Sequence, residues 1–248
     1  MIAFNSHINA PQNNTNARVC NLCNSKNCLI HKINETFLDN NTSQSTIIKC
    51  KRSQQFIIEG APVNGLFFIK KGTVKVFRTG INGREQIVRF AKSCEIIGHR
   101  GFGTQEYYSI GAIAIQDTEL YYFSKEYLQK ILLENPKFSY EMMLFYANEL
   151  NRSENKVKSI SQMTVRERVI DSLLYIYRKF GDLRGFLNLP LSRKEYADYA
   201  GTTEEQVIRV FSALKKERLI ITKGKKIAIN NLQSLKNEIS EHNYYLDL

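Results

Sequence analysis

The distribution of glycine divides this chain into two parts that must fold differently. Nine of its 13 glycines lie within residues 60–111, whereas residues 137–180 contain neither glycine nor proline. The glycine-rich part holds short runs of β-branched and aromatic residues at 66–70, 73–78, 85–90, 109–115 and 119–123. Short strands separated by glycine turns are typical of a β-sandwich or a barrel-like roll. The sequence therefore predicts an N-terminal β-roll followed by a helical region.

A long helix is predicted to start at Pro136, directly after the roll. Proline is favoured at the first helical position, where its missing N–H has no intrahelical partner, and Asn135 is a favourable N-cap. The helix carries an approximate apolar stripe formed by Phe138, Met142, Phe145, Leu150, Val157 and Ile160. Such a stripe fits packing on the roll as well as pairing with the same helix of a second subunit. The second arrangement predicts a homodimer with a parallel helix pair.

The C-terminal part contains the pattern of a helix-turn-helix with a wing. A hydroxyl residue followed three positions later by Glu or Gln occurs at Thr164/Glu167, Ser192/Glu195 and Thr203/Gln206. This spacing is typical of helix starts, so we expect a new helix after Met163 with a hinge at 161–164, and two short helices beyond it that end near Tyr199 and Glu217. Ala200-Gly201 supplies a tight turn between those helices. Residues 219–222 and 227–230 are predicted to form two strands around a basic turn.

Charge is distributed unevenly along the chain, whose net charge is +11. Residues 151–230 hold 17 Lys and Arg against nine Asp and Glu, so this part favours a polyanionic partner, double-stranded DNA. In a helix-turn-helix the second helix enters the major groove, and its first residues reach the base edges. The residues expected to contact DNA are Arg193, Thr202, Thr203, Glu204, Glu205, Gln206, Arg209, Lys215 and Lys225.

Glu205 and Arg209 are four positions apart and share one face of the predicted recognition helix. A carboxylate there can accept from cytosine N4, and a guanidinium can donate to guanine O6 and N7. The alternative is an exposed ion pair that only supports the helix. The basic residues around the wing suit phosphate contacts, although each could also be a solvated surface charge; they are Lys215, Lys216, Arg218, Lys223, Lys225 and Lys226.

Other classes of protein fit the sequence less well. No apolar run approaches the ~20 residues of a membrane span, and the first 20 residues lack the features of an export signal, so we expect a cytoplasmic protein. A catalytic metal site in the roll would need clustered histidines, yet only His99 of the four lies there. We therefore expect no enzyme. A small-ligand-binding protein without a transcriptional role is the alternative, and it leaves the helix-turn-helix pattern unexplained.

The order of these parts resembles the CRP/FNR family of bacterial transcription regulators over roughly residues 30–230. The resemblance rests on "FFIKKGTVKVF", "CEIIGHRGF", the long helix, and "LSRKEYADYAGTTEEQVIRVFSALKKERLI". Glu205 and Arg209 match residues that the family's recognition helix commonly carries. Glu204 departs from the Arg of the cyclic-AMP receptors. Membership implies a homodimer on a twofold DNA site, an effector in the roll and RNA polymerase as a further partner.

The resemblance implies an α+β fold with a roll of the cyclic-nucleotide-binding type, a jelly-roll-like double sheet, then a long dimerisation helix and a C-terminal winged helix-turn-helix. The expected divisions are 1–29 for a flexible cysteine-containing tail, 30–135 for the roll, 136–162 for the dimerisation helix and hinge, 163–235 for the DNA-binding domain, and 236–248 for a C-terminal tail.

The effector pocket implied by the family consists of Gly98, His99, Arg100, Tyr108 and Ser109. Cyclic-AMP receptors carry a Glu for the ribose after the Ile-Gly step and an Arg-Ser pair for the phosphate. Here His99 follows Gly98, Tyr108 precedes Ser109, and neither the Glu nor the Arg is present. Charge-assisted hydrogen bonds worth ~1.5–3 kcal/mol each would be lost, so we expect cyclic AMP not to bind. Arg100 remains able to bind another anion.

Three cysteines near the N-terminus have the spacing C-x2-C-x4-C; they are Cys20, Cys23 and Cys28. In a reducing compartment such spacing favours metal binding, and it is similar to the iron–sulfur motif of the FNR branch. An iron–sulfur cluster and zinc are both compatible, with His31, Cys94 or Cys50 as the fourth ligand. The late cysteine of the FNR branch has no counterpart in residues 120–122. Alternatively, the three thiols bind nothing.

Overall fold

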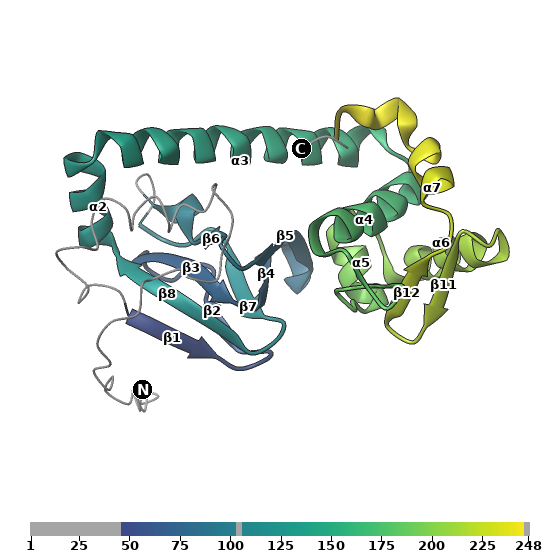
Figure 1. Cartoon of the computed structure of the whole chain (residues 1–248), viewed down its shortest axis with the longest axis horizontal. Helices are drawn as coiled ribbons and strands as arrows, with labels where there is room; N and C mark the ends of the chain where they lie inside the picture. The colour runs from purple at the N-terminus through teal and green to yellow at the C-terminus, as the bar shows by residue number, and fades with distance from the viewer. Residues whose placement is uncertain (1–45, 103–105, 246–248) are drawn as a thin grey trace.

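The computed structural model describes residues 46–102 and 106–245 and confirms the predicted α+β architecture (Figure 1). A β-roll comes first, a long straight helix extends across it, and a helical domain with a two-stranded wing follows. The cysteine-containing segment of 1–29 and the first part of the predicted roll, 30–45, lie outside the described residues.

Two four-stranded antiparallel sheets make up the roll. Their strands are β1 (Thr46–Cys50), β2 (Gln55–Ile57), β3 (Gly65–Lys71), β4 (Thr73–Thr79), β5 (Glu85–Lys92), β6 (Ile96–Ile97), β7 (Gly111–Ala114) and β8 (Thr118–Ser124). One sheet has the order β1-β8-β3-β6 and the other β2-β7-β4-β5. The five predicted runs correspond to β3, β4, β5, β7 and β8. The prediction omitted β1, β2 and β6, of which the last two have only three and two residues.

The roll core lies between the two sheets, where side chains such as Ile69, Val74 and Leu120 are fully buried. Gly111 shows how closely the strands approach. A Cβ on Gly111 would lie 2.5 Å from Cζ of Phe77 on the neighbouring strand β4. No other residue fits this position without moving the ring.

Two helices follow the roll: α2 (Lys125–Glu134) and α3 (Pro136–Gln162). The predicted start of α3 is confirmed, because Asn135 Oδ1 accepts from the N–H of Phe138 at 3.0 Å and Pro136 occupies the first helical turn. The apolar stripe of α3 divides into two parts. Phe138 and Met142 are buried against the roll, whereas Val157 is 68% exposed.

The C-terminal domain contains helices and two small hairpins. They are α4 (Val165–Phe180), β9 (Asp182–Leu183), β10 (Phe186–Leu187), α5 (Arg193–Ala200), α6 (Glu204–Lys216), β11 (Ile220–Lys223), β12 (Lys226–Ile229) and α7 (Leu232–Glu238). Helices α5 and α6 form the predicted helix-turn-helix, and Gly201 between them has φ +66°. Helix α7 crosses the division expected at residue 235, since Leu235 and Ile239 are both buried in this domain's core.

Capping hydrogen bonds start the helices as predicted, with one difference. Reciprocal capping boxes form at Thr164 with Glu167 and at Ser192 with Glu195. At α6 the Thr203 hydroxyl accepts from the Gln206 N–H, but the Gln206 side chain bonds the Thr202 hydroxyl instead of the N-cap backbone. The start of α6 is therefore fixed by one half of a box.

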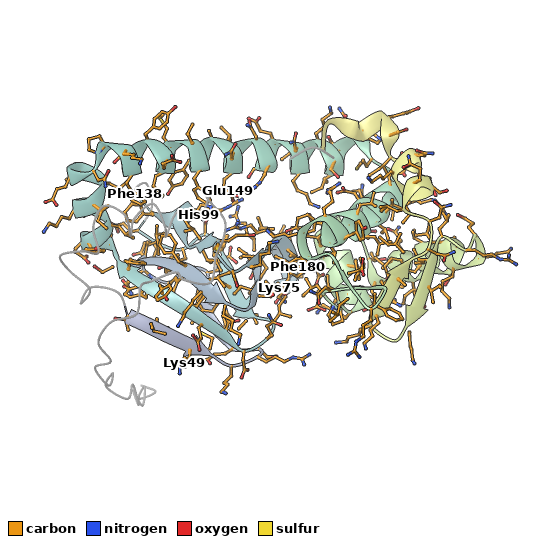
Figure 2. The ribbon with its side chains drawn as sticks, viewed as in Figure 1. Lys49, Lys75, His99, Phe138, Glu149 and Phe180 are labelled. Carbon is orange, nitrogen blue, oxygen red and sulfur yellow. The ribbon has the colours of Figure 1, made fainter. Side chains whose placement is uncertain are left out.

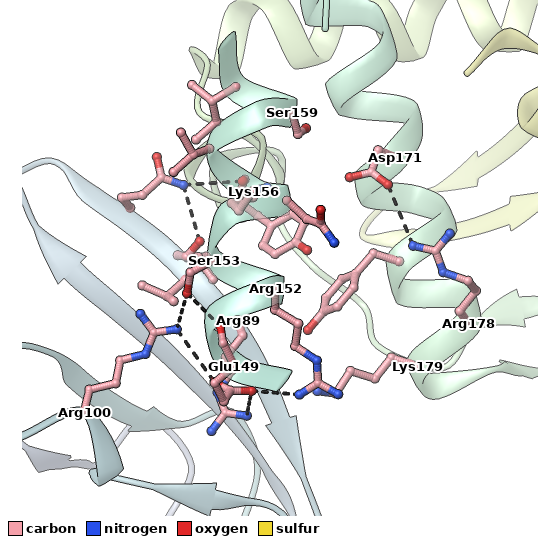
Figure 3. A pocket seen from close by; sticks show the side chains of 18 of the residues that line it. Arg89, Arg100, Glu149, Arg152, Ser153, Lys156, Ser159, Asp171, Arg178 and Lys179 are labelled. Atoms are coloured by element: carbon pink, nitrogen blue, oxygen red, sulfur yellow. Dashed lines mark hydrogen bonds and ion pairs between the residues drawn. The ribbon is translucent and has the colours of Figure 1, made fainter. Parts of the chain in front are cut away.

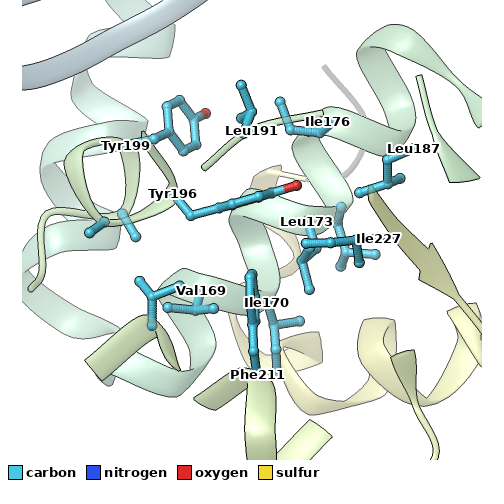
Figure 4. Close-up of a cluster of buried hydrophobic side chains, with 14 of the residues drawn as sticks. Val169, Ile170, Leu173, Ile176, Leu187, Leu191, Tyr196, Tyr199, Phe211 and Ile227 are labelled. Carbon is cyan, nitrogen blue, oxygen red and sulfur yellow. The ribbon is translucent and has the colours of Figure 1, made fainter. Parts of the chain in front are cut away.

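The core of the C-terminal domain forms where α4 meets α5, α6 and the wing (Figure 4). Val169, Ile170 and Leu173 of α4 are fully buried, and they pack with Tyr196 of α5 and Phe211 of α6. The spacing of the α4 residues at i, i+1 and i+4 gives one apolar face. This packing fixes α5 and α6 against α4.

Strand β5 of the roll contacts the C-terminal domain through hydrogen bonds. The Gln86 side-chain amide donates to the carbonyl of Asp198 at 2.6 Å, at the end of α5. The Tyr175 hydroxyl of α4 donates to the Phe90 carbonyl and accepts from the Phe90 N–H. None of the helices in the described ranges has the length and apolar character to span a membrane.

Candidate nucleic-acid interface

Helix α6 turns one face inward and leaves the other free. Val207, Phe211 and Leu214 are buried, at the i, i+4, i+7 spacing of a helix face. On the opposite side the predicted contact residues Thr203, Glu204, Glu205, Gln206 and Arg209 are all exposed, while Thr202 is half-buried. The start of the predicted recognition helix is thus accessible.

Glu205 and Arg209 do not pair with each other. Among the described residues no ion pair within 4.0 Å joins their side chains, so the alternative of a surface ion pair has no support in the geometry. Hydrogen bonds from its own backbone N–H and from the Thr203 hydroxyl lower the pKa of Glu205, and the charges of Arg209 and Arg84 add to this. Glu205 is therefore an ionised acceptor at neutral pH.

Arg193 holds the helix-turn-helix to the wing. Its Nη2 donates to the carbonyl of Gly224 in the wing turn at 3.3 Å, and its guanidinium lies 4.7 Å from the ring centroid of Phe211. Because these contacts link α5, α6 and the β11–β12 turn, Arg193 positions the wing beside the recognition helix.

The predicted phosphate-contacting side chains surround this surface. All six are exposed, and none forms an ion pair within 4 Å in the part of the chain that the structure describes; they are Lys215, Lys216, Arg218, Lys223, Lys225 and Lys226. Unpaired cations at the end of α6 and along the wing produce a positive field beside an exposed helix. Such a surface suits the phosphates that flank a major groove.

The residues of the predicted effector pocket do not converge. Tyr108 is buried, its hydroxyl donates to the Gly65 carbonyl at 2.8 Å, and its ring lies beside Gly98, which has φ +91°. Ser109 is half-buried. His99 and Arg100 instead contact helix α3. Gly98 and Tyr108 thus share one place in the roll, and His99 and Arg100 share another.

A buried carboxylate on α3, that of Glu149, contacts the side chains of His99 and Arg100. Glu149 is only 5% exposed, and Figure 2 shows it on α3 directly above His99. Glu149 Oε2 lies 3.3 Å from His99 Nε2 and 3.7 Å from Arg100 Nη2, and Oε1 lies 2.7 Å from Arg152 Nη1. Arg89 of β5 is the fourth partner, at 3.7 Å.

The electrostatics of this cluster favour an ionised Glu149. Burial alone would raise the pKa of the carboxyl, but the contact with His99 and the charge of Arg89 outweigh it and hold the pKa far below its ordinary value. Burial lowers the pKa of His99. Glu149 was not among the site residues predicted from the sequence. The available signal was its position seven residues after Met142 and four after Phe145, on the roll-facing side of the helix.

The structure brings no metal site together in the described ranges. Cys20, Cys23, Cys28 and His31 all lie outside the described residues. Cys50 is buried at the end of β1, where burial raises the pKa of its thiol, and Cys94 is half-buried in a turn with φ +73°. Within residues 46–102 and 106–245, no three His, Cys, Asp or Glu side chains could together hold a metal ion.

Comparisons with known proteins agree with this geometry. Residues 47–135 match the model of the cyclic nucleotide-binding domain, and residues 167–238 match that of the Crp-like helix-turn-helix domain. The transcriptional activator protein anr of Pseudomonas aeruginosa is 28% identical over 183 residues, covering 72% of this chain and 74% of the relative. The anaerobic regulatory protein of Pasteurella multocida is 26% identical over 216 residues, covering 84% and 77%.

Solved structures show the same arrangement of parts. FixK2 from Bradyrhizobium japonicum superposes with a TM-score of 0.70 at 25% identity, and the match covers 78% of this chain and 96% of that one. The two matched domain models and this superposition together span the roll, the long helix and the helix-turn-helix.

Proposed function

Because the chain belongs to the CRP/FNR family and is a DNA-binding transcription regulator of that type, we propose that it reads an inverted-repeat site as a homodimer. The observation that carries this proposal is the exposed start of α6, with an ionised Glu205 and an Arg209 that pairs with no carboxylate of the described residues, flanked by the cationic wing. Proteins of this family are in general regulators rather than enzymes, and we assign no catalytic residue.

Dimerisation is supported by the second half of α3. Leu150, Val157 and Ile160 are 60%, 68% and 43% exposed, on a helix that already buries its first apolar residues against the roll. Pairing this stretch with the same helix of a second copy would cover these side chains. A twofold dimer presents two recognition helices, so the half-sites should be inverted repeats with centres about 34 Å apart.

Base readout is assigned to Glu205 and Arg209, with Thr202, Thr203, Glu204 and Gln206 at the rim of the same surface. Lys215 and Lys225 are assigned to phosphates, and Arg193 to positioning the wing. A gel shift with random duplex and with a selected site, at stated salt, tests this function. A shift of both duplexes that falls with salt, and is stronger for the selected site, is the expected result. No shift of either at 50 mM salt would contradict it.

Cyclic AMP is not the effector in this proposal. His99 and Arg100, the residues after Gly98, are engaged by Glu149, and the Tyr108 ring fills the space beside Gly98. The position that would need an acid for the ribose is therefore taken by a side chain held against α3. Calorimetric binding of cyclic AMP at micromolar affinity, with tighter DNA binding, would overturn this point.

Cys20, Cys23 and Cys28 are proposed to bind a metal group, an iron–sulfur cluster ahead of zinc. Three thiolates are suitable donors for either, and two relatives are named as anaerobic regulatory proteins. The fourth ligand would be His31, Cys94 or Cys50. A cluster would supply an oxygen-sensitive group in the segment before the roll. Iron, zinc and sulfide analysis of anaerobically purified protein tests this, and protein with none of the three would contradict it.

RNA polymerase is proposed as the further partner, and the cytoplasm as the location, because a regulator that binds chromosomal DNA in a bacterium works there. Co-purification of polymerase subunits with the DNA-bound protein tests the partner.

A further inference from the structure

A cavity of about 490 Å³ lies where the roll, α3 and α4 meet (Figure 3). Strand β5 contributes Arg89, α3 contributes Arg152 and Lys156, and α4 contributes Asp171 and Arg178. The cavity therefore has walls from both domains and from the helix between them. Gly98 and Tyr108 do not line it, but Arg100 of the predicted effector pocket does.

The charge of the cavity wall is strongly positive. Six basic and three acidic side chains line it. The acids are already compensated: Glu149 lies 2.7 Å from Arg152, Glu95 2.8 Å from Lys179, and Asp171 3.8 Å from Arg178. An excess of positive charge in a partly enclosed space is unfavourable unless an anion enters.

Lys156 has no close ion-pair partner among the described residues, and the charge of Asp171 acts on it from a greater distance. Its Nζ lies 3.9 Å from the ring centroid of Tyr199, and no carboxylate oxygen of the described residues lies within 4 Å of it. Burial lowers its pKa to about 8, which still leaves the ammonium charged at neutral pH. The side chain is half-buried and faces the cavity with Arg178 of α4 on the other wall (Figure 3).

We propose that this cavity binds a small metabolite carrying at least two negative charges, held by Lys156 and Arg152 of α3 and by Arg178 of α4. Its volume is within the ~300–1,000 Å³ of metabolite sites, so a single small ion would leave most of the cavity unfilled. Phosphate groups and carboxylates share the required chemistry, and the experiment distinguishes them.

The position of the site gives it a consequence that rests on the proposed function. A ligand held between α3 and α4 spans the hinge, because α3 ends at Gln162 and α4 begins at Val165. Helix α4 packs directly on α5 and α6. Occupancy would therefore favour one orientation of the recognition helices in the dimer and alter their affinity for DNA.

Calorimetry on the full chain tests the site directly, with inorganic pyrophosphate and citrate as probes. We expect at least one probe to bind at one molecule per chain, with a Kd below 1 mM that weakens as NaCl is raised. Lys156→Gln and Arg178→Gln should each weaken binding about tenfold or more, since each removes a charge-assisted contact. Lys130→Gln, an exposed lysine on α2, is the matched control and should bind as wild type.

Binding of pyrophosphate alone assigns a phosphorylated ligand, and binding of citrate alone a polycarboxylate. Absence of binding by both probes up to 10 mM, or unchanged affinity in both variants, overturns the site. Lys156→Arg, which keeps the charge, should bind within a few-fold of wild type and separates loss of the contact from misfolding. Probe binding without any change in DNA affinity would refute the coupling alone, and absence of DNA binding would refute the proposed function alone.

Discussion

Replacing Glu149 with glutamine tests whether the buried carboxylate fastens α3 to the roll. The substitution keeps the shape of the side chain and removes its charge. Four cationic or protonatable groups contact the carboxylate, from β5, from the loop after β6 and from α3 itself. The roll and α3 would then lose the negative charge that balances the cationic side chains of both.

The magnitude follows from burial and from the partners that remain. Breaking a buried ion pair by removing one partner costs about 3–5 kcal/mol. The lower end applies here, because Arg152 is 58% exposed and Arg89 keeps a second carboxylate, Glu95, at 3.3 Å. We therefore expect Glu149→Gln to lower the free energy of unfolding by about 3 kcal/mol at pH 7.

Urea unfolding at fixed protein concentration measures this change. Glu154→Gln, an exposed carboxylate on the same helix, is the control and should change stability by less than about 0.5 kcal/mol. The folded-state pKa of Glu149 is depressed, so its contribution is complete above the ordinary value of 4.5 and is lost as the pH falls through the folded-state value. The difference between wild type and variant should therefore shrink below pH 4.5. A loss under 1 kcal/mol at pH 7, or one independent of pH, would refute the reasoning.

Three further predictions concern assembly, phosphate contact and packing. The wild type should be a dimer by light scattering at micromolar concentration, and Val157→Glu should shift it toward monomer, whereas a monomeric wild type would contradict the pairing of α3. Lys225→Ala should weaken binding to all DNA sequences alike and reduce the salt slope by about 1; a sequence-dependent loss would count against a phosphate contact. Gly111→Ala should destabilise the protein by about 1–3 kcal/mol, because the added Cβ meets the Phe77 ring, and a neutral change in urea unfolding would show that the ring moves freely.

Most of the fold could be predicted from patterns among residues close together in the sequence. The N-caps Asn135, Thr164, Ser192 and Thr203 were recognised because capping joins residues only three positions apart. Gly201 predicted the turn of the helix-turn-helix, and its φ of +66° is a conformation that glycine adopts at little cost. Strands β2 and β6 were not predicted, because two or three residues are too few to show the alternation of apolar and polar side chains that indicates a strand.

Contacts between residues far apart in the sequence could not be predicted. Glu149 and His99 are 50 positions apart, and only the folding of the roll beneath α3 brings them together. The same holds for Gln86 of β5 and Asp198 of α5, and for the cavity around Lys156. The expected effector residues were taken from the family pattern, and two of them, His99 and Arg100, lie against α3 because a buried acid attracts them.

The central claim is that α6 reads bases through Arg209, and binding-site selection on wild type and on Arg209→Ala tests it most directly. Wild type should select an inverted repeat. Arg209→Ala should relax the preference at a single symmetric G·C position in each half-site, at a cost of about 1–3 kcal/mol there, because a bidentate contact to guanine is lost. An unchanged preference at every position of the selected site would contradict the account.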